Sequence, residues 1–438
     1  MNQSKAIIVV ENRDALRVAA SSARISTQQG TAMEIFENSR GDERDLKLIG
    51  KVLSSGHKSV IEHQNFSIAF NNVSVLVEQF VIEARLASYT VKSRRYVDFA
   101  GAGYVVPDGL TGARREAYDA AMQLRFADYQ ALMDLGVPKE DARFVLPYCL
   151  RSNFFMTVNA RELIALVCAM LRGRGAGFPE IESLGAQLKG QFDAIYPGVI
   201  DVELKHVKPY APMPLSAAIE APKEGKGGAE LVSTPSDASG LLDVALGFAG
   251  RVPEKQERRD RIRELLMDAR PRELELLNYV FRVKNISLAC LTHFARHRIQ
   301  SPVIPQVATA LAGGRYVMPE SVRAIPEAAA IYRHAFEDQT AKATQAMGLG
   351  VSPQDIGYFA MSGHQLDILL GMNARELMHF MRLRTCSRAQ WEIRGVAGRM
   401  LELLREDQPE LFDMYGASCR FGPCPEGKMS CGRPWERI

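Results

Sequence analysis

The feature that most constrains this chain is a divergent internal repeat, because a repeated sequence implies a repeated structural unit. Three segments of the first half recur in the second half in the same order and at similar spacing. This agreement indicates a tandem duplication. The matched segments are Val158–Leu163 with Met372–Leu377, Asn72–Leu76 with Asn285–Ala289, and Arg95–Val97 with Arg315–Val317.

Length and local composition predict where the repeats lie. A chain of 438 residues exceeds what a single hydrophobic core usually serves. The stretch from about residue 206 to 245 is rich in Pro, Gly and Lys, which is typical of a linker or exposed segment. We therefore expect a first repeat over 1–205, a second over 246–410, and a cysteine-rich tail over 411–438.

The predicted elements do not alternate in a βαβ rhythm, which favours an α+β fold with two pseudo-symmetric repeats. An opening apolar run, Ala6–Val10, predicts a buried strand, and two further runs in the first repeat look β-like. Four longer stretches are predicted to be helical. The β-like runs are Phe66–Phe70 and Tyr104–Val106, and the helical stretches are 75–86, 141–171, 286–296 and 373–404.

Composition excludes several function classes. The net charge of +3 is too small to indicate nucleic-acid binding through bulk electrostatics. The sequence contains no apolar run long enough to span a bilayer and no export signal, so we expect a cytoplasmic protein that binds no membrane. Seven cysteines in such a compartment predict thiols or a metal site rather than a disulfide framework.

Arginine is concentrated at two places in the second repeat. Arg296-His297-Arg298 follows an apolar run, and five arginines lie between apolar residues from 375 to 394. Two interpretations are open at this stage. The arginines form either a solvated basic face of an amphipathic helix or a wall that binds phosphate through bidentate guanidinium contacts.

Together these motifs resemble the flavin-dependent thymidylate synthases. In the second repeat the resemblance rests on three motifs, and in the first repeat on three others in family order. It covers most of residues 50–175 and 280–405. The motifs are Arg296–Arg298, Asn373–Arg375 and Met381–Arg394, and then Gly56–His63, Leu86–Val97 and Arg143–Pro147.

The resemblance implies an activity and its cofactors. Members of this family methylate deoxyuridine monophosphate (dUMP) at C5, with methylenetetrahydrofolate as carbon donor and NADPH recharging a bound flavin adenine dinucleotide (FAD). Positioned arginines polarise the pyrimidine while the flavin performs the redox chemistry. The family forms homotetramers whose cavities lie between subunits. A duplicated chain is therefore expected to form a homodimer that imitates this tetramer.

When the functional residues of the family are matched to this sequence position by position, some fall in the first repeat and the others in the second. The first repeat keeps the nucleotide-facing set Ser93, Arg95 and Arg143, joined by Arg85, and the early flavin-facing set His57, Ser59 and Glu62. The second repeat keeps the flavin-facing set Arg296, His297, Arg298, Asn373, Arg375 and His379, together with Arg384. Arg384 and Ser93 are the expected catalytic residues, and Arg384 also contacts the substrate.

Each repeat has lost what the other keeps. In the first repeat Glu83-Ala84-Arg85 replaces Arg-His-Arg, and Met170 replaces the late arginine. The second repeat has Gln306 or Gly313 at the serine position and Gly357 at the position of Arg143. It shows no Gly-His…Glu-His segment between residues 232 and 279. The losses are reciprocal, so we expect half of the ancestral cavities to be active and about one flavin per chain.

One departure leaves the reaction open. The family usually has Asn-Glu before the serine, whereas this chain has Thr90-Val91 and then Lys92. The local charge changes by about two units, which matters for an anionic nucleotide. Two alternatives therefore stand beside dUMP methylation. They are another flavin-dependent pyrimidine-nucleotide modification and a catalytically degenerate paralogue that binds flavin or nucleotide as a scaffold or regulator.

Four cysteines lie late in the chain, at Cys386, Cys419, Cys424 and Cys431. Four thiolates suit a closed tetrahedral zinc site, which would attach the tail to the helix that carries Cys386. An iron–sulfur cluster and free thiols are the alternatives.

Overall fold

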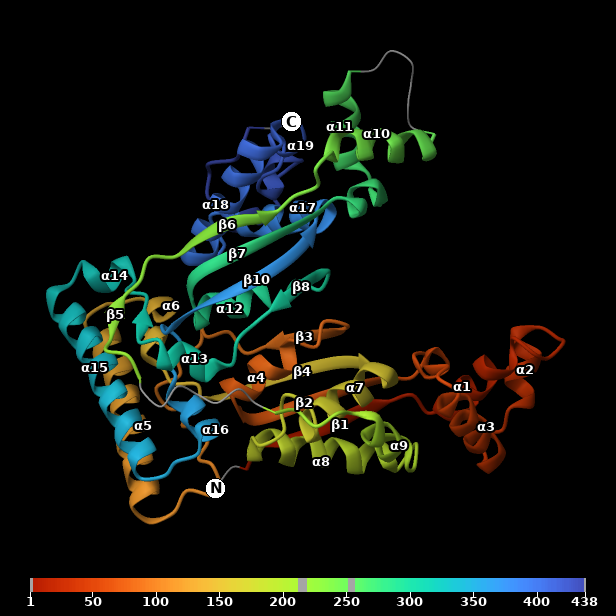
Figure 1. The fold of residues 1–438 in the computed structure, drawn as a ribbon, viewed down its shortest axis with the longest axis horizontal. Helices are drawn as coiled ribbons and strands as arrows, with labels where there is room; N and C mark the ends of the chain where they lie inside the picture. The colour runs from red at the N-terminus through yellow and green to blue at the C-terminus, as the bar shows by residue number, and fades with distance from the viewer. Residues whose placement is uncertain (1–2, 212–218, 251–256, 437–438) are drawn as a thin grey trace. The chain divides into compact units, whose positions relative to one another are not determined.

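The computed structural model describes residues 3–211, 219–250 and 257–436. The chain divides into two compact units (Figure 1). Unit 1 comprises the described residues of 1–218 together with 324–361, and unit 2 comprises those of 219–323 and 362–438. Residues 324–361 were predicted to belong to the second repeat, yet they pack with the first. The boundary between the units is therefore not the predicted one.

Unit 1 is built on a four-stranded antiparallel sheet with strand order β1-β2-β4-β3. Inward side chains alternate along β4, and aromatic residues fill the core, where the rings of Phe70 and Phe154 stack with centroids 4.5 Å apart. Figure 1 shows α7, α8 and α9 gathered along the sheet. The strands are β1 (Lys5–Glu11), β2 (Asn65–Ser74), β3 (Ala87–Val91) and β4 (Arg151–Asn159), and these helices are α7 (Ala160–Leu171), α8 (Pro179–Asp193) and α9 (Val199–His206).

The remaining elements of unit 1 are short helices and two long ones. They are α1 (Ala15–Arg24), α2 (Ala32–Asn38), α3 (Glu43–Ser54), η1 (Lys58–Ile61), α4 (Val75–Ile82), α5 (Gly112–Asp134), α6 (Lys139–Ala142), η2 (Arg143–Val145), α15 (Pro326–Gly348), α16 (Pro353–Ile356) and η4 (Gly357–Phe359).

A buried arginine joins the two long helices of unit 1. The side chain of Arg125 in α5 is almost fully buried and donates to the carbonyl of Ala335 in α15 at 2.6 Å. It also forms ion pairs with Asp128 at 2.8 Å and Asp338 at 3.0 Å. A buried cation needs such partners, because leaving water is costly. This network explains why residues 324–361 belong to unit 1.

Unit 2 contains a second four-stranded antiparallel sheet, with order β6-β7-β10-β8. Its strands are β6 (Gly228–Ser233), β7 (Asn278–Ser287), β8 (Gln300–Val303) and β10 (Gln365–Asn373), and β5 (Lys223–Glu224) pairs with β9 (Arg315–Tyr316). Its helices are α10 (Ala238–Phe248), α11 (Arg258–Met267), η3 (Arg272–Leu276), α12 (Leu288–Phe294), α13 (Val307–Ala312), α14 (Glu320–Arg323), α17 (Ala374–Arg384), α18 (Trp391–Asp407), α19 (Pro409–Phe412), η5 (Ser418–Arg420) and η6 (Gly427–Met429).

The central strands of both sheets carry the same irregularity. Asn72 in β2 and Asn285 in β7 have positive φ angles of 56° and 49°, which asparagine tolerates better than most residues. In each case the backbone N–H donates to a side chain on the next strand, Asn153 at 2.9 Å and Asp367 at 2.9 Å. The two sheets therefore share a β-bulge as well as a strand order.

The helices that follow these strands begin at matched caps. A serine oxygen accepts from the third residue of α4 and of α12, and an asparagine oxygen does the same in α7 and α17. The capping residues are Ser74, Ser287, Asn159 and Asn373. The predicted mixture of helices and strands without a βαβ rhythm is confirmed.

Three predicted elements were wrong. The stretch 141–171 is not one helix, because β4 lies within it. Its aromatic and β-branched residues alternate in and out of the core. The stretch 373–404 is split into α17 and α18. The predicted linker 206–245 contains β6, which pairs with β7, and α10; residues 212–218 lie outside the described residues.

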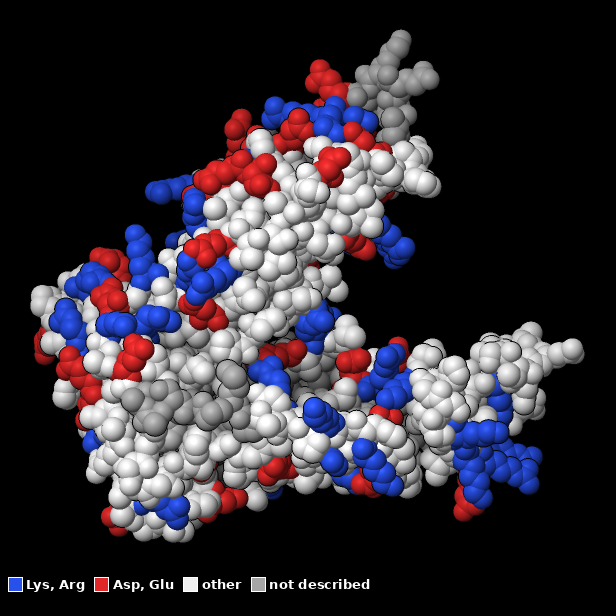
Figure 2. Space-filling model, viewed as in Figure 1, with Lys and Arg blue, Asp and Glu red and all other residues white. Residues whose placement is uncertain are grey.

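Smaller differences concern the predicted strands. The opening run forms β1 as expected, but it is an edge strand, and Val9 and Val10 are about half exposed rather than buried. Tyr104 makes only an isolated bridge to Leu150. Basic and acidic side chains are interspersed on the face shown in Figure 2, in line with the small net charge. Within the described residues, the helices are all too short or too polar to cross a membrane.

Candidate functional site

The predicted nucleotide-facing residues meet in unit 1. Arg95 forms an ion pair with Glu140, with 2.5 Å between Nε and Oε1, and Arg143 Nε donates to the backbone carbonyl of Glu140 at 2.9 Å. The Ser93 hydroxyl accepts from the backbone N–H of Arg95 at 3.3 Å. Unit 1 therefore brings Ser93, Arg95 and Arg143 together around Glu140.

Arg143 is the least satisfied cation of this group. Only 4% of the residue is exposed, and its Nη2 has no hydrogen-bond partner among the described residues. Burial and the nearby Arg94 charge lower the pKa of Arg143 to about 10, although Glu140 opposes the shift. A buried donor without a partner costs stability unless a ligand satisfies it. Arg143 is thus suited to hold an electron-rich oxygen.

Sequence reasoning missed the residue that anchors this loop. Arg94 is buried and makes a bidentate ion pair with Glu78 in α4, at 2.6 and 3.0 Å, and Ser152 donates to the same carboxylate at 2.5 Å. Burial lowers the pKa of Arg94, but the Glu78 carboxylate raises it more, so the pKa lies above its ordinary value. Fixing Arg94 inside the protein fixes the positions of Ser93 and Arg95 on either side of it.

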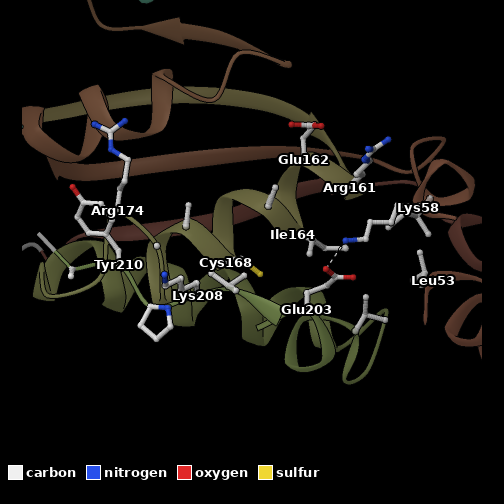
Figure 3. A pocket seen from close by; sticks show the side chains of 18 residues that line it. Leu53, Lys58, Arg161, Glu162, Ile164, Cys168, Arg174, Glu203, Lys208 and Tyr210 are labelled. Atoms are coloured by element: carbon white, nitrogen blue, oxygen red, sulfur yellow. Dashed lines mark hydrogen bonds and ion pairs between the residues drawn. The ribbon is translucent and has the colours of Figure 1, made fainter. Parts of the chain in front are cut away.

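The early flavin-facing segment of the first repeat adjoins a pocket of about 920 Å³ in unit 1. Figure 3 shows Arg174 and Tyr210 at one end of this pocket and the Lys58–Glu203 ion pair, 2.6 Å long, at the other. Two further cations along its rim are paired with carboxylates, Arg161 with Glu62 at 2.6 Å and Arg174 with Glu83 at 2.9 Å. The cations that could bind the phosphates of a dinucleotide here are therefore already paired with carboxylates.

The other residues of this segment lie at the surface. His57 and Ser59 are exposed at the start of η1, and Arg85 is exposed after α4. Burial raises the pKa of Glu83 above its ordinary value, against the opposing charge of Arg174. The loss of Arg-His-Arg in the first repeat thus places a carboxylate, not a phosphate-binding cation, at the end of α4.

In unit 2 the central histidine of Arg-His-Arg lies inside the protein. His297 is 3% exposed, and its Nδ1 lies 2.9 Å from Oε1 of Glu376 in α17. The Nε atom of Arg384, also in α17, donates to His297 Nε2 at 3.0 Å. Because Nε2 must accept, the hydrogen of the neutral ring lies on Nδ1 and is donated to Glu376.

The electrostatics agree with a neutral imidazole. Burial, together with the nearby Arg384 and His379 side chains, lowers the pKa of His297 to about 2. Burial also raises the pKa of Glu376 to about 7, while His379 and Arg375 oppose the shift. His297 was predicted to belong to the flavin-binding set, and both of its ring nitrogens are engaged by side chains of unit 2.

Replacing Glu376 with glutamine is expected to stabilise the protein relative to the wild type as the pH rises from about 4.5 to about 7. In this window the folded wild type retains a proton that the unfolded chain releases, so its unfolding free energy falls with pH. Glutamine does not titrate. The difference should grow by more than about 1 kcal/mol across the window and be independent of pH below it. Urea unfolding across this range measures the difference, and a pH-independent value would contradict the expectation.

The remaining flavin-facing residues of unit 2 reach the surface. Arg296 and Arg298 are exposed on either side of His297, and His379 is exposed on α17. Asn373 caps α17, its Oδ1 accepting from the backbone N–H of Glu376 at 2.8 Å. These positions place exposed basic side chains beside His297 in the sequence, and the His379 ring lies 5.6 Å from the His297 ring between centroids.

A residue that the sequence analysis overlooked pairs with Arg375. Glu275 in η3 forms an ion pair with Arg375, as Glu62 does with Arg161 in unit 1. The backbone agrees, because Ala160 donates to Gln64 at 2.9 Å and Ala374 to Leu277 at 2.8 Å. The second repeat was predicted to lack the Gly-His…Glu-His segment, and this is corrected in one respect, since the glutamate of the segment persists as Glu275. Glu62 and Glu275 are separated by the same number of residues as Asn72 and Asn285.

The second repeat does not reproduce the nucleotide-facing loop of the first repeat. Gln306 precedes α13 and Gly313 ends it. Gly357, at the position corresponding to Arg143, lies in unit 1, where an added Cβ would stand 3.2 Å from Leu76 Cδ1. A larger side chain at this position would require Leu76 to shift.

The predicted four-cysteine zinc site is not formed. Among the described residues, no three His, Cys, Asp or Glu side chains are grouped so that they could hold a metal ion. The tail is held by other contacts: the Arg382 guanidinium lies 4.0 Å from the Phe421 ring centroid, and Tyr415 donates to the carbonyl of Ala374 at 3.0 Å. Cys419 Sγ accepts from the backbone N–H of Trp435 at 3.3 Å.

Comparison with known proteins gives a consistent result. A flavin-dependent thymidylate synthase from Geobacter sulfurreducens is 43% identical over 120 residues, covering 26% of this chain and 52% of that protein. The match thus spans about half of that relative's length. Another, from Nitratidesulfovibrio vulgaris, is 33% identical over 193 residues, covering 41% of this chain and 78% of the relative.

Solved structures and a family model add to this comparison. The crystal structure of Thymidylate Synthase X from Helicobacter pylori with FAD and dUMP has 22% identity and a TM-score of 0.38, covering 46% of this chain and 100% of that one. The family model described as thymidylate synthase complementing protein matches two segments, residues 8–198 and 232–410. The resemblance predicted from the sequence is confirmed. The chain belongs to the thymidylate synthase complementing protein family.

Proposed function

We propose that this protein methylates dUMP at C5, using FAD, methylenetetrahydrofolate and NADPH, and that it is a tandem-duplicated, asymmetric member of its family. The observation that carries the proposal is the buried guanidinium of Arg143, whose Nη2 has no hydrogen-bond partner among the described residues. A cation in this state is expected to have an anionic or carbonyl-bearing ligand.

The nucleotide is assigned to the residues around Arg143. Arg95 and Arg143 supply guanidinium donors, and Ser93 supplies a hydroxyl, which together suit the phosphate and carbonyl oxygens of a pyrimidine nucleotide. Arg95 is paired with Glu140, so nucleotide binding would exchange one anionic partner for another. Lys92 is exposed beside this loop and adds positive charge where the family usually has a carboxylate.

The flavin is assigned to the second repeat. The exposed cations Arg296 and Arg298, together with Arg375 and His379 on α17, form a donor set that suits the pyrophosphate of a dinucleotide. The first repeat fits this group less well, because Glu83-Ala84 stands where the second repeat has Arg296-His297, and Glu83 is paired with Arg174. When bound and reduced, the flavin supplies the hydride. The protein's part is to bind the nucleotide, and to polarise the pyrimidine through Arg384.

The duplication is inferred from matched local structure. The two sheets have the same strand order, the same bulge at Asn72 and Asn285, and the same caps before their helices. The nucleotide-facing and flavin-facing sets are carried by different repeats, so one chain supplies one complete set. We infer a homodimer that imitates the family tetramer, with about one flavin per chain.

Release of tritium from C5-labelled dUMP tests the reaction. The full-length protein, supplied with FAD, methylenetetrahydrofolate and NADPH, is expected to release tritium to water and form thymidylate. A flavin absorption spectrum without tritium release would favour another pyrimidine-nucleotide modification. Absence of both would favour a scaffold or regulator. A saturated flavin-to-chain ratio near two would contradict the asymmetric duplication.

A further inference from the structure

The hydrogen-bonded chain Glu376–His297–Arg384 in unit 2 has a fixed direction. His297 donates from Nδ1 to Glu376 and accepts at Nε2 from Arg384, with heavy-atom distances of 2.9 and 3.0 Å. Glu376 and His297 are both more than nine-tenths buried, whereas Arg384 is partly exposed. The chain thus runs from the interior of unit 2 to a guanidinium at its surface.

We propose that Glu376 and His297 are positioning residues that orient the guanidinium of Arg384 for its action on the pyrimidine. This inference rests on the proposed function, because it concerns the residue assigned there to polarise the substrate. Glu376 sets the tautomer of His297, and His297 in turn binds the Nε–H of Arg384. The other guanidinium nitrogens are thereby held in one orientation.

The contact between His297 and Arg384 depends on which imidazole nitrogen carries the proton. If Glu376 no longer accepts, the hydrogen of the neutral ring is free to move to Nε2. That atom would then be a donor facing the Nε–H of Arg384, and the contact between them would be lost. A misplaced catalytic donor costs far more in the transition state than in the ground state.

Further polar side chains lie near this hydrogen-bonded chain. Arg375 and His379 lie on the same helix, and Glu275 of η3 pairs with Arg375. Arg384 Nη2 additionally donates to the backbone carbonyl of His293 in α12 at 3.4 Å, a longer contact than the one to His297. The first repeat has Ala84 where His297 stands and Met170 where Arg384 stands, so it retains only the glutamate, Glu162.

Two substitutions separate the proposed role from simple core packing. Glu376→Leu removes the acceptor, whereas Glu376→Gln keeps an oxygen that accepts from Nδ1. Glu376→Leu should lower kcat for dUMP methylation about 10- to 100-fold with KM for dUMP changed less. Glu376→Gln should restore most of the activity. Asp355→Leu is the matched control, because it removes another buried carboxylate, in unit 1, that is hydrogen-bonded to Ser352.

Nitrogen-15 NMR of labelled histidine gives a readout that does not depend on turnover. The signal of His297, identified by its absence in His297→Gln, should report the Nδ1–H tautomer in the wild type and in Glu376→Gln, and should lose it in Glu376→Leu. An Nε2–H tautomer in the wild type would overturn the proposal, even if Glu376→Leu does not fold. Wild-type activity in an active, folded Glu376→Leu would overturn it as well.

The two proposals fail differently. If the wild type does not methylate dUMP but shows the tautomer pattern above, the proposed function fails while the orientation of Arg384 by His297 is supported. If methylation occurs and the pattern is absent, the proposed function stands and the positioning role is overturned.

Discussion

Replacement of Arg143 by methionine is expected to raise KM for dUMP about 100-fold while leaving the free protein more stable than the wild type by about 1 kcal/mol. The two effects have one cause. Arg143 is a buried cation whose Nη2 has no partner among the described residues, and burial with nearby positive charge lowers its pKa to about 10. Removing such a charge relieves a desolvation cost in the free protein and removes a donor from the bound nucleotide.

The matched control for Arg143 is its neighbour Arg94. Arg94→Met removes another buried guanidinium, but this one is bidentate to Glu78. Its loss leaves the buried Glu78 carboxylate without its cation and should cost about 3–5 kcal/mol of unfolding free energy. Urea unfolding and equilibrium binding of dUMP measure the two quantities. Equal destabilisation by both substitutions, or unchanged dUMP binding by Arg143→Met, would show that Arg143 is structural.

Replacement of Arg384 by lysine is expected to lower kcat for dUMP methylation about 100- to 1000-fold, the usual cost of losing one donor that acts in the transition state. Lysine keeps the positive charge but has neither the planar fork nor the Nε–H that His297 accepts. KM for dUMP should change much less than kcat, because Arg95 and Arg143 are assigned to ground-state binding.

Arg382 provides the control on the same helix. Its guanidinium donates to the backbone carbonyl of Leu266 at 2.8 Å and lies over the Phe421 ring. Arg382→Lys should therefore weaken the packing of the tail on α17 and leave kcat within about threefold. Steady-state kinetics with tritium-labelled dUMP compares the two variants. A kcat for Arg384→Lys within about threefold of the wild type would exclude Arg384 as the polarising residue.

Much of the candidate site could be predicted from the sequence, because its residues lie in short motifs with local causes. Asn159 and Asn373 cap helices through oxygens that reach only three residues ahead. Ser93 and Arg95 lie on one loop, and Arg143 reaches the same carboxylate-bearing residue, Glu140. Strand β4 was missed because the pattern of 141–171 was interpreted as one helical period, although its alternation has a period of two.

The partners of charged residues were harder to predict. Nothing near Arg94 in the sequence indicates that it, rather than Arg95, is buried against Glu78. Glu275 escaped notice because the histidines that normally mark its segment are absent, while its pairing with Arg375 crosses 100 residues. The zinc prediction failed for a related reason, since cysteine spacing does not specify whether four thiols converge.

The sequence by itself determined the order, spacing and residue types of the motifs, which are properties of the chain, and from them we predicted two divergent copies of one unit and the motifs that each copy kept. Only the tertiary structure decided which cations have partners. Arg143 remained without one at Nη2, Arg384 was attached to His297, and the cations of the first repeat were neutralised by Glu62 and Glu83. Such pairings depend on burial and on the distances between segments that are far apart in the sequence. A buried charge has lost its water, so its stability depends on whether such a segment supplies a partner.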